Sequence, residues 1–385
     1  MSMFQGFARV WTPVELSKRL RRRPLSRVVA GERIVLFRDA QGRAAALLDR
    51  CPHRGVALSL GGVTAEGQLE CPFHGWRFDA AGQCTHVPFN PKARCEQLSA
   101  TALPTRELAG LLWIYTAPGV DAPDEPVLDE SLTSAEFVRF AQIKTWQAHW
   151  TRAMENMLDM PHLPFVHRTT IGSDLKKRMR PDSEMRTEWI PTEHGGQIRS
   201  TVDGLDGGAL LEFVRPNRMA LHIPIPGRRL RMHVACVPAE ANQTRMVLIT
   251  TRDFLRWLPT GPIDNWMNAR IALQDQAIVE SSQPPEVPPP GQERSVASDK
   301  PTLQFRKYYF ETLRDSQVAA PGRLVSLGRR PASASVDASA IDAEREDGGI
   351  AGAASGLDSD GDLPKPGHEQ VDRRDAVLAG ASGRG

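Results

Sequence analysis

Cysteine, long apolar runs and net charge are all scarce in this sequence, and each absence excludes a class of protein. Five cysteines in 385 residues are few and odd in number, which argues against a secreted disulfide framework and predicts a reducing, cytoplasmic compartment. No apolar run approaches the ~20 residues of a membrane span, and the N-terminus lacks the basic lead and apolar stretch of a signal peptide. Because 48 basic residues balance 46 acidic ones, nucleic acid is not expected as a partner.

Aromatic residues are absent from the last part of the chain. No Phe, Trp or Tyr follows Phe310, and Ala, Gly, Ser, Asp and Arg dominate after residue 318. Such a segment cannot bury enough apolar surface to offset the entropy lost on ordering. The sequence therefore predicts a disordered tail over 319–385. The overall composition, 41% apolar and 24% charged, is that of a globular protein with room for two domains.

The beginning of the chain favours β-structure. The apolar stretch Arg33–Arg38 is followed by the turn signal Asp39–Gly42 and by a returning apolar stretch, Ala44–Leu48. A further apolar stretch, Leu111–Tyr115, precedes an Ala-Pro-Gly sequence that ends the region. These features predict a first domain over 1–118.

A second domain is predicted over 137–318, after a Pro- and Asp-rich linker at 119–136. This domain mixes helical and strand patterns and shows no internal repeat. The expected helices are His149–Asp159 and Ile263–Ser281, and the expected strands are Met219–Ile223, Leu230–Val237 and Thr244–Thr251.

Two short motifs in the first domain each offer one thiolate and one imidazole. They are a C-x-H motif at Cys51 and His53 and a C-x-x-H motif at Cys71 and His74. Zinc sites usually pair like ligands, as C-x2-4-C and H-x3-5-H, so zinc is the alternative here. One thiolate and one imidazole per loop fit a [2Fe-2S] cluster in which one iron takes both cysteines and the other takes both histidines, the Rieske arrangement.

The blocks Asp49–Gly55 and Cys71–Phe78 resemble those of the Rieske non-haem iron oxygenases. The Rieske proteins of respiratory chains look different, because they carry an extra disulfide pair in these loops and a Ser where this chain has Trp76. The resemblance implies an α+β fold, with an N-terminal all-β Rieske domain followed by a helix-grip (START-like) antiparallel-sheet catalytic domain. It also implies the single-subunit branch that includes vanillate O-demethylases, phthalate oxygenases and pheophorbide a oxygenases.

A second set of metal-ligand residues lies in the stretch Met154–His167. His162 and His167 are five residues apart, and Asp159 precedes His162 by three. Two histidines and one carboxylate with open positions are the usual ligands of oxygen-activating non-haem Fe(II). The stretch also resembles the oxygenase pattern of an acid, three residues, Asp, two residues, His, four residues and His, with Glu155 as the leading acid.

The third ligand of this iron has to be a distant carboxylate. In the family it lies on a C-terminal helix, and the stretch Leu273–Pro284 resembles that helix. Asp275 lies on an apolar face of this helix, where a carboxylate is costly unless it is paired or binds a metal. Asp275 is therefore the predicted ligand, with Glu280 and Asp264 as alternatives.

Asp159 is predicted to act in catalysis without being a ligand. It precedes His162 by one helical turn, so it can accept a hydrogen bond from the free N–H of that imidazole. The resemblance implies that Asp159 also meets His74 of a neighbouring subunit and gives electrons a short path between the two metal centres. A head-to-tail contact that closes gives a ring, and a homotrimer is expected.

Apolar residues of the expected strands are candidates for the walls of the substrate pocket. They are Phe213, Val214, Leu221, Ile223 and Val234. His222 and His233 lie on the same strands and face either the pocket or the strand surface, which is the commoner place for a histidine.

The resemblance implies a terminal oxygenase. Electrons from NAD(P)H would arrive through a separate reductase or ferredoxin, because no G-x-G-x-x-G fingerprint opens a βαβ unit here. They would pass from the cluster to Fe(II), and O2 would hydroxylate or demethylate a small organic, cyclic or aromatic substrate. The alternative is an electron-transfer Rieske protein without oxygenase activity, but such a carrier would end near residue 115. The sequence does not decide the substrate or distinguish these reactions from dihydroxylation.

Overall fold

The structure is a computed structural model that describes residues 3–120, 122, 125–258 and 261–314. All of these residues fall within one compact unit. The predicted tail at 319–385 lies outside the described residues. None of the described helices combines the length and the apolar composition needed to cross a membrane.

The N-terminal part consists of three small antiparallel sheets, which confirms the all-β prediction. Their strand orders are β1-β11-β10, β2-β3-β4-β9 and β5-β6-β7-β8. The strands are β1 (Trp11–Leu16), β2 (Leu25–Val29), β3 (Glu32–Arg38), β4 (Ala44–Leu48), β5 (Gly62–Val63), β6 (Leu69–Glu70), β7 (Arg77–Phe78), β8 (Cys84–His86), β9 (Ala102–Leu103), β10 (Thr105–Leu108) and β11 (Leu111–Tyr115). Short 3-10 turns lie at Ser17–Arg19, Leu58–Leu60 and Cys95–Gln97.

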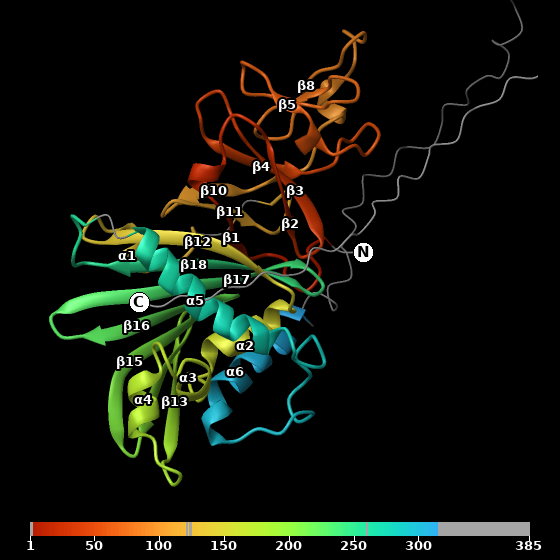
Figure 1. Cartoon of the computed structure of the whole chain (residues 1–385). Coiled ribbons are helices and arrows are strands. Elements are labelled where there is room, and N and C mark those ends of the chain that lie inside the picture. Colours follow the sequence, from red (N-terminus) through yellow and green to blue (C-terminus); the bar gives the residue numbers. More distant parts are fainter. Residues whose placement is uncertain (1–2, 121, 123–124, 259–260, 315–385) are drawn as a thin grey trace, which may run out of the picture. The chain divides into compact units, whose positions relative to one another are not determined.

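The C-terminal part is built on one antiparallel sheet with the strand order β12-β18-β17-β16-β15-β14-β13. Figure 1 shows helix α5 lying across this sheet, with α2, α3 and α4 beside it, which confirms an antiparallel-sheet domain of mixed α and β structure. The strands are β12 (Val138–Trp146), β13 (Met185–Thr192), β14 (Gly195–Val202), β15 (Leu205–Val214), β16 (Arg218–Ile225), β17 (Arg228–Glu240) and β18 (Gln243–Arg252). The helices are α1 (Glu130–Thr133), α2 (Trp150–Leu158), α3 (Leu163–Val166), α4 (Ser173–Arg178), α5 (Gly261–Val279) and α6 (Lys300–Tyr308), followed by a π-helical turn at Tyr309–Arg314.

The period-two alternation of strand side chains divides this sheet into two different faces. Met219 pairs with Val234 and Val234 with Leu248, so these apolar side chains lie on the face that α5 covers. The neighbouring pair, Ala220 and His233, lies on the opposite face. One face can therefore form an apolar chamber while the other carries polar groups.

The end of the predicted linker packs against that polar face. Asp129 caps α1 by accepting a hydrogen bond from the Ser131 N–H, and the Ser131 hydroxyl contacts Nε2 of His233 at 3.0 Å. Arg231 contacts both carboxylate oxygens of Asp129 at 2.6 Å. Burial lowers the pKa of His233 to about 4, although the Asp129 charge opposes the shift. The segment expected as a linker is thus structured from Asp129 onward, because these polar groups satisfy one another on the sheet.

Strands from both parts of the chain are joined by backbone and ionic contacts. The loop after β2 donates two backbone hydrogen bonds to β17, from Ala30 to the Pro238 carbonyl at 2.9 Å and from Gly31 to the Ala239 carbonyl at 2.7 Å. Glu15 on β1 is fully buried and contacts Arg245 of β18 at 3.0 Å. An uncompensated buried carboxylate would be costly, so this pair ties β1 to the large sheet.

Candidate metal centres

Two loops in the N-terminal part present the predicted cluster ligands in matching backbone conformations. In each loop the cysteine N–H donates to the carbonyl five residues later, at 2.8 Å for both Cys51 and Cys71. The glycine four residues later donates back to the cysteine carbonyl, at 2.8 Å for Gly55 and 3.0 Å for Gly75. Both glycines have positive φ, 72° and 67°, which other residues adopt only with strain. The two motifs therefore form a pair of equivalent ligand loops.

The cysteines of these loops point inward and the histidines lie outside them. Cys51 and Cys71 are 3% and 2% exposed. The rings of His53 and His74 are 4.6 Å apart, and His53 stacks on Trp76 at 4.5 Å. Nδ1 of His53 is buried and has no hydrogen-bond partner among the described residues, as expected of an atom reserved for a metal. The set of two inner thiols and two outer imidazoles fits a Rieske [2Fe-2S] cluster.

The surroundings of the two cysteines and the contacts that hold the two ligand loops also suit a bound cluster. Burial raises the pKa of Cys51 to about 11, and the nearby Cys71 thiol adds to the increase, so two adjacent thiolates need bound cations to persist. Asp49 is 1% exposed and holds the first loop by accepting from the Ser59 N–H at 2.8 Å and the Ser26 hydroxyl at 2.9 Å. Gly61 leaves room for the second loop, since a Cβ there would lie 1.9 Å from the Glu70 carbonyl oxygen.

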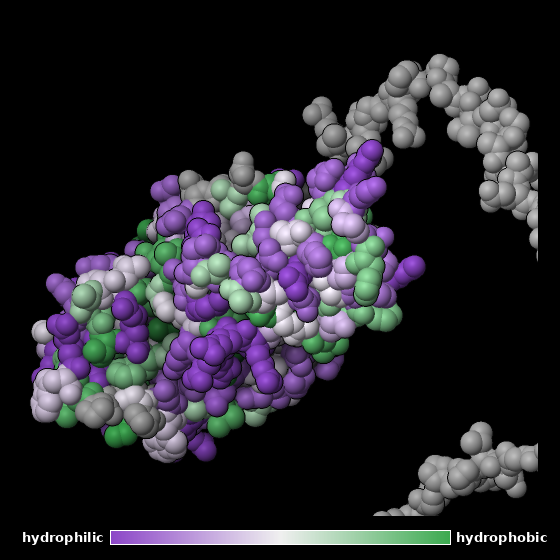
Figure 2. Space-filling view, turned by 90° about the horizontal axis from the view of Figure 1, so that it is seen from above, coloured by the Kyte–Doolittle hydropathy of each residue, from purple (hydrophilic) through white to green (hydrophobic). Residues whose placement is uncertain are grey.

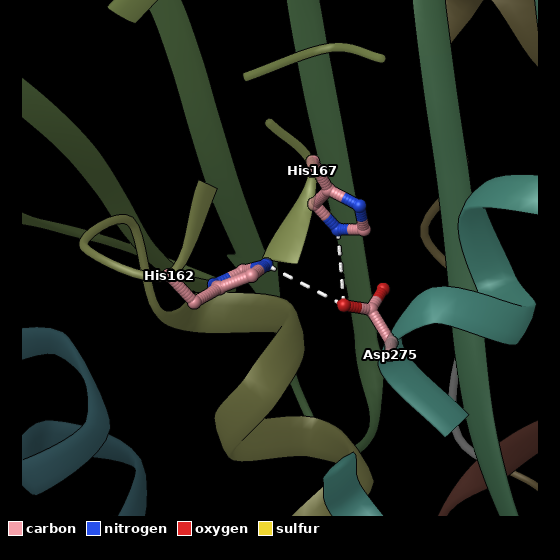
Figure 3. Close-up of side chains that lie close together, drawn as sticks. All are labelled: His162, His167 and Asp275. Atoms are coloured by element: carbon pink, nitrogen blue, oxygen red, sulfur yellow. Dashed lines mark ion pairs between the residues drawn. The ribbon is translucent and has the colours of Figure 1, made fainter. Parts of the chain in front are cut away.

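The second centre brings together His162, His167 and Asp275. The two histidines flank the short helix α3, and Asp275 comes from the inner face of α5. Nε2 of His167 lies 3.0 Å from Oδ1 of Asp275, and Nε2 of His162 lies 3.6 Å from the same oxygen. Figure 3 shows the three side chains converging on one point. Asp275 is 4% exposed and its Oδ1 makes no regular hydrogen bond with the described residues, so this donor set fits a metal ion.

Each histidine of this centre is held through its other ring nitrogen. Nδ1 of His162 lies 3.0 Å from Oδ2 of Asp159, which also accepts from the His162 backbone N–H at 3.0 Å. Nδ1 of His167 lies 3.0 Å from Oε1 of Gln274, and the Thr170 hydroxyl donates to the same oxygen at 3.1 Å. Because both acceptors require a proton on Nδ1, Nε2 of each ring is left as a metal ligand.

The structure separates the other acids named from the sequence from this centre. Oε1 of Glu280 accepts from the Gln147 N–H at 2.7 Å, so Glu280 secures the end of α5 rather than joining the three donors. Glu155 is paired with Arg306 of α6 and Arg152 of α2. The side chain of Asp264 lies outside the described residues. Gln274 was not identified from the sequence, because its contact with His167 joins residues 107 positions apart.

A cavity of about 60 Å³ lies beside the three donors and adjoins a larger one of about 550 Å³. Leu221 and Val234 line the small cavity, as the sequence predicted, and Ile223 lines the larger one. Phe213 and Val214 are not among the described residues that line either cavity. Both are among the residues around a third cavity, of about 270 Å³. Phe213 pairs with Met219, so its side chain shares the helix-covered face and packs on Phe305 of α6, whereas Val214 faces the other way. The small cavity can hold a methyl group or a ring edge, and the larger one the rest of a substrate.

A second polar group with ligand-type side chains lies on the opposite face of the sheet. Asp129, Glu212 and His222 have potential ligand atoms within 4.8 Å of one another. However, Asp129 already contacts the Arg231 guanidinium, and Nε2 of His222 contacts Glu212 at 3.2 Å. This group is therefore a satisfied ionic network rather than a second set of free metal donors.

Comparison with known protein families assigns both parts of the chain. Residues 10–104 match the Rieske [2Fe-2S] domain, and residues 146–314 match the vanillate O-demethylase oxygenase C-terminal domain. Chlorophyllide a oxygenase of Chlamydomonas reinhardtii is 30% identical over 287 residues, which are 71% of this chain and 42% of that protein. Methylxanthine N3-demethylase NdmB of Pseudomonas putida is 26% identical over 314 residues, 75% of this chain and 82% of the relative. The chain spans about half the length of the first curated relatives it matches.

Solved structures share the same fold. Pseudomonas putida NdmB superposes with a TM-score of 0.70 at 24% identity, over 82% of this chain and 95% of that one. Dicamba monooxygenase bound to dicamba superposes with a TM-score of 0.69 at 21% identity, over 81% and 98% of the two chains. The chain therefore joins a Rieske [2Fe-2S] domain to a vanillate O-demethylase-type oxygenase domain, the pair of domains found in the alpha subunits of Rieske oxygenases.

Proposed function

We propose that this chain is the terminal oxygenase of a Rieske system, which uses O2 and electrons from a separate reductase or ferredoxin to oxidise a small organic substrate. The observation that carries the proposal is the convergence of His162, His167 and Asp275 beside an apolar cavity. A simple electron carrier would have no use for three metal donors fixed from two helices next to a cavity. This observation favours an oxygenase over the alternative of an electron-transfer Rieske protein.

In this proposal the two donor sets hold different metals. Cys51, His53, Cys71 and His74 hold the [2Fe-2S] cluster, and His162, His167 and Asp275 hold Fe(II). When bound, the cluster supplies single electrons and the mononuclear iron supplies the activation of O2.

The residues around the mononuclear site fix its donors and exclude water. Asp159 and Gln274 hold the two imidazoles with Nε2 toward the metal position. Apolar side chains such as Met219, Leu221 and Val234 form the walls of the cavity, so bulk water is kept away from the reacting group. A substrate seated there would be held with its reactive carbon or methyl group close to the metal donors.

We further propose that the active form is a homotrimeric ring in which His74 of one subunit meets Asp159 of the next. The Asp159 side chain is 27% exposed, so it can contact His162 and a partner at once. His74 is exposed and its neighbour Phe73 is 59% exposed. In the view of Figure 2, hydrophilic and hydrophobic residues are interspersed over the face that is seen. Closure of such head-to-tail contacts gives a ring.

The substrate class follows from the relatives and the cavity. The names of relatives include a chlorophyllide a oxygenase, a dicamba O-demethylase and a methylxanthine N3-demethylase. We propose a cyclic or aromatic substrate that is hydroxylated or oxidatively demethylated, in a reducing cytoplasmic compartment.

Counting metal in the purified chain tests the proposal. An oxygenase binds about three iron atoms per chain, two in the cluster and one at the triad, whereas a carrier binds about two. Iron and acid-labile sulfide would be measured on the anaerobically reconstituted protein, and Glu280→Ala serves as the control for Asp275→Ala. Two irons in the wild-type chain, or full iron in Asp275→Ala, would overturn the oxygenase assignment.

A further inference from the structure

Two buried N–H donors beside the mononuclear site have no acceptor. Nε1 of Trp146 and Nδ2 of Asn156 belong to residues that line the small cavity together with His162, His167 and Asp275. Neither atom has a hydrogen-bond partner in the described part of the chain, and Trp146 is 0% exposed. Leaving a buried donor without an acceptor is energetically costly, because its hydrogen bond with water is lost and not replaced. A bound molecule that brings an acceptor to these atoms recovers that cost.

The third neutral polar side chain of this cavity behaves differently. Asn268 lies two turns before Asp275 on the same face of α5, and its Nδ2 donates to the Thr250 hydroxyl at 2.7 Å. The protein thus provides an acceptor for Asn268 but not for Trp146 or Asn156. The two unsatisfied donors are exceptions that point to a ligand.

The charge of the cavity limits what that ligand can be. Among the described residues that line it there is no Lys or Arg, and the acidic ones are Asp159 and Asp275. An anionic group placed here would be buried without a cationic side chain and close to two carboxylates. The remaining lining residues are apolar: Met157, Met160, Leu163, Ile171, Leu211, Met219, Leu221, Met232, Val234, Leu248, Ile271 and Ala272.

Charged side chains gather instead in the larger adjoining cavity. Asp174, Arg178, Arg180 and Asp203 line it. Arg180 is already paired with Asp203 at 3.2 Å and with Asp182 at 3.5 Å. The cationic side chains that could meet a charge on a substrate therefore lie away from the metal donors.

We infer that the reacting end of the substrate is uncharged and carries an oxygen acceptor, as in an aryl ether or a ring carbonyl, which receives hydrogen bonds from Trp146 Nε1 and Asn156 Nδ2. This inference rests on the oxygenase function proposed above and narrows its substrate class. It assigns Trp146 and Asn156 to substrate selection rather than to holding metal.

Three probes of nearly the same size test the inference by calorimetry on the iron-loaded protein. 1,2-Dimethoxybenzene is neutral and carries ether oxygens, 1,2-diethylbenzene replaces those oxygens with CH2, and phthalate replaces each methoxy group with a carboxylate. Since only this probe gains two neutral hydrogen bonds, 1,2-dimethoxybenzene should bind about tenfold more tightly than either of the others. Equal binding of the three, tighter binding of phthalate, or no binding of either neutral probe would overturn the inference.

Variants then assign the preference to the two donors. Trp146→Phe removes the N–H and keeps most of the ring, and Asn156→Leu removes the amide and keeps the volume. Each should lower the affinity for 1,2-dimethoxybenzene about threefold or more and leave that for 1,2-diethylbenzene unchanged, at unchanged iron content. Trp257→Phe, at a tryptophan 81% exposed, is the control and should bind like wild type.

If both variants still prefer 1,2-dimethoxybenzene over 1,2-diethylbenzene as strongly as wild type does, the assignment of Trp146 and Asn156 to substrate selection is overturned. Binding is measured without turnover, so this result is separate from the test of the oxygenase function. If iron at the triad is present but no O2-dependent product forms, the proposed function fails while the binding preference still stands.

Discussion

The two proposed metal centres are built in different ways. The cluster loops take their four donors from two segments only 20 residues apart, and the backbone hydrogen bonds that shape each loop lie within it, from Cys51 to Val56 and from Cys71 to Trp76. The triad takes its third donor from helix α5, where Asp275 lies more than 100 residues beyond His167, and the position of that helix depends on the whole sheet. A local site tolerates changes elsewhere in the chain, whereas a composite site is sensitive to them.

The two substitutions with the largest expected effects should each remove the metal from one centre and leave the other centre intact. Cys51→Ala should abolish the visible absorption and the EPR signal of the cluster while Fe(II) still binds at the triad. Asp275→Ala should do the reverse, with activity reduced at least about 10³-fold because one of three ligands is lost. Iron analysis and EPR on both variants check the prediction. Loss of both metals from either variant would show that the centres are not independent.

The next effect concerns the residue proposed to connect the two centres. Asp159→Asn keeps the shape but removes the charge that favours a proton on Nδ1 of His162. Activity should fall about 100-fold with both metals retained. Oxidation of the pre-reduced cluster by O2 with substrate, followed by stopped-flow absorbance, should be correspondingly slow. Near wild-type oxidation at full iron content would exclude Asp159 from the electron path. Loss of the mononuclear iron would mean that its main effect is on His162.

A smaller effect is expected at Gln274, which orients His167. Gln274→Leu removes the acceptor for Nδ1, and the affinity for Fe(II) should fall about tenfold, in the range known for residues that position metal ligands. Gln274→Glu restores an acceptor and should recover most of the affinity. Competition with a chelator of known affinity measures both. Equal losses in the two variants would mean that volume rather than the hydrogen bond matters at this position.

The smallest predicted effect tests whether the cluster loops are locally stabilised. Asp49→Asn exchanges an acceptor-only side chain for one with an amide that cannot replace all contacts with Ser26 and Ser59. The variant should lose about 1–2 kcal/mol of stability and bleach its cluster faster, while Fe(II) binding at the triad stays unchanged. Thermal denaturation followed separately by cluster absorbance and by far-UV circular dichroism distinguishes the local effect from a global one.

This contrast also explains what the sequence could and could not reveal. The two loop motifs and the His162–His167 spacing lie within short stretches, so local pattern was enough to find them. Asp275 was proposed because the helix around it resembled one in a known family, and the apolar face on which it lies agreed with that. Gln274 gave no signal, because its contact with His167 exists only after α5 has packed across the sheet.

The same limit applies to the pocket and the linker. Leu221 and Val234 were correctly placed in the cavity wall, but Phe213 packs against α6 instead and Val214 faces the opposite side of the sheet. Strand alternation predicts that neighbours face opposite ways but does not say which face α5 will cover. Likewise, Pro and Asp content predicted a linker up to residue 136, whereas the Asp129–Arg231 pair that structures its end depends on a distant strand.

The placement of two functional residues on helix α5 determines how the substrate specificity can be redesigned. Asp275 and Gln274 are adjacent on it and together fix one metal ligand and the orientation of another. The opposite wall of the cavity, by contrast, comes from β16, β17 and β18 through Leu221, Val234 and Leu248. Libraries that randomise these strand positions and leave α5 intact can therefore alter which molecules are accepted without dismantling the iron site. Transplanting α5 alone from a distant homologue would endanger both the Asp275 ligand and the orientation of His167.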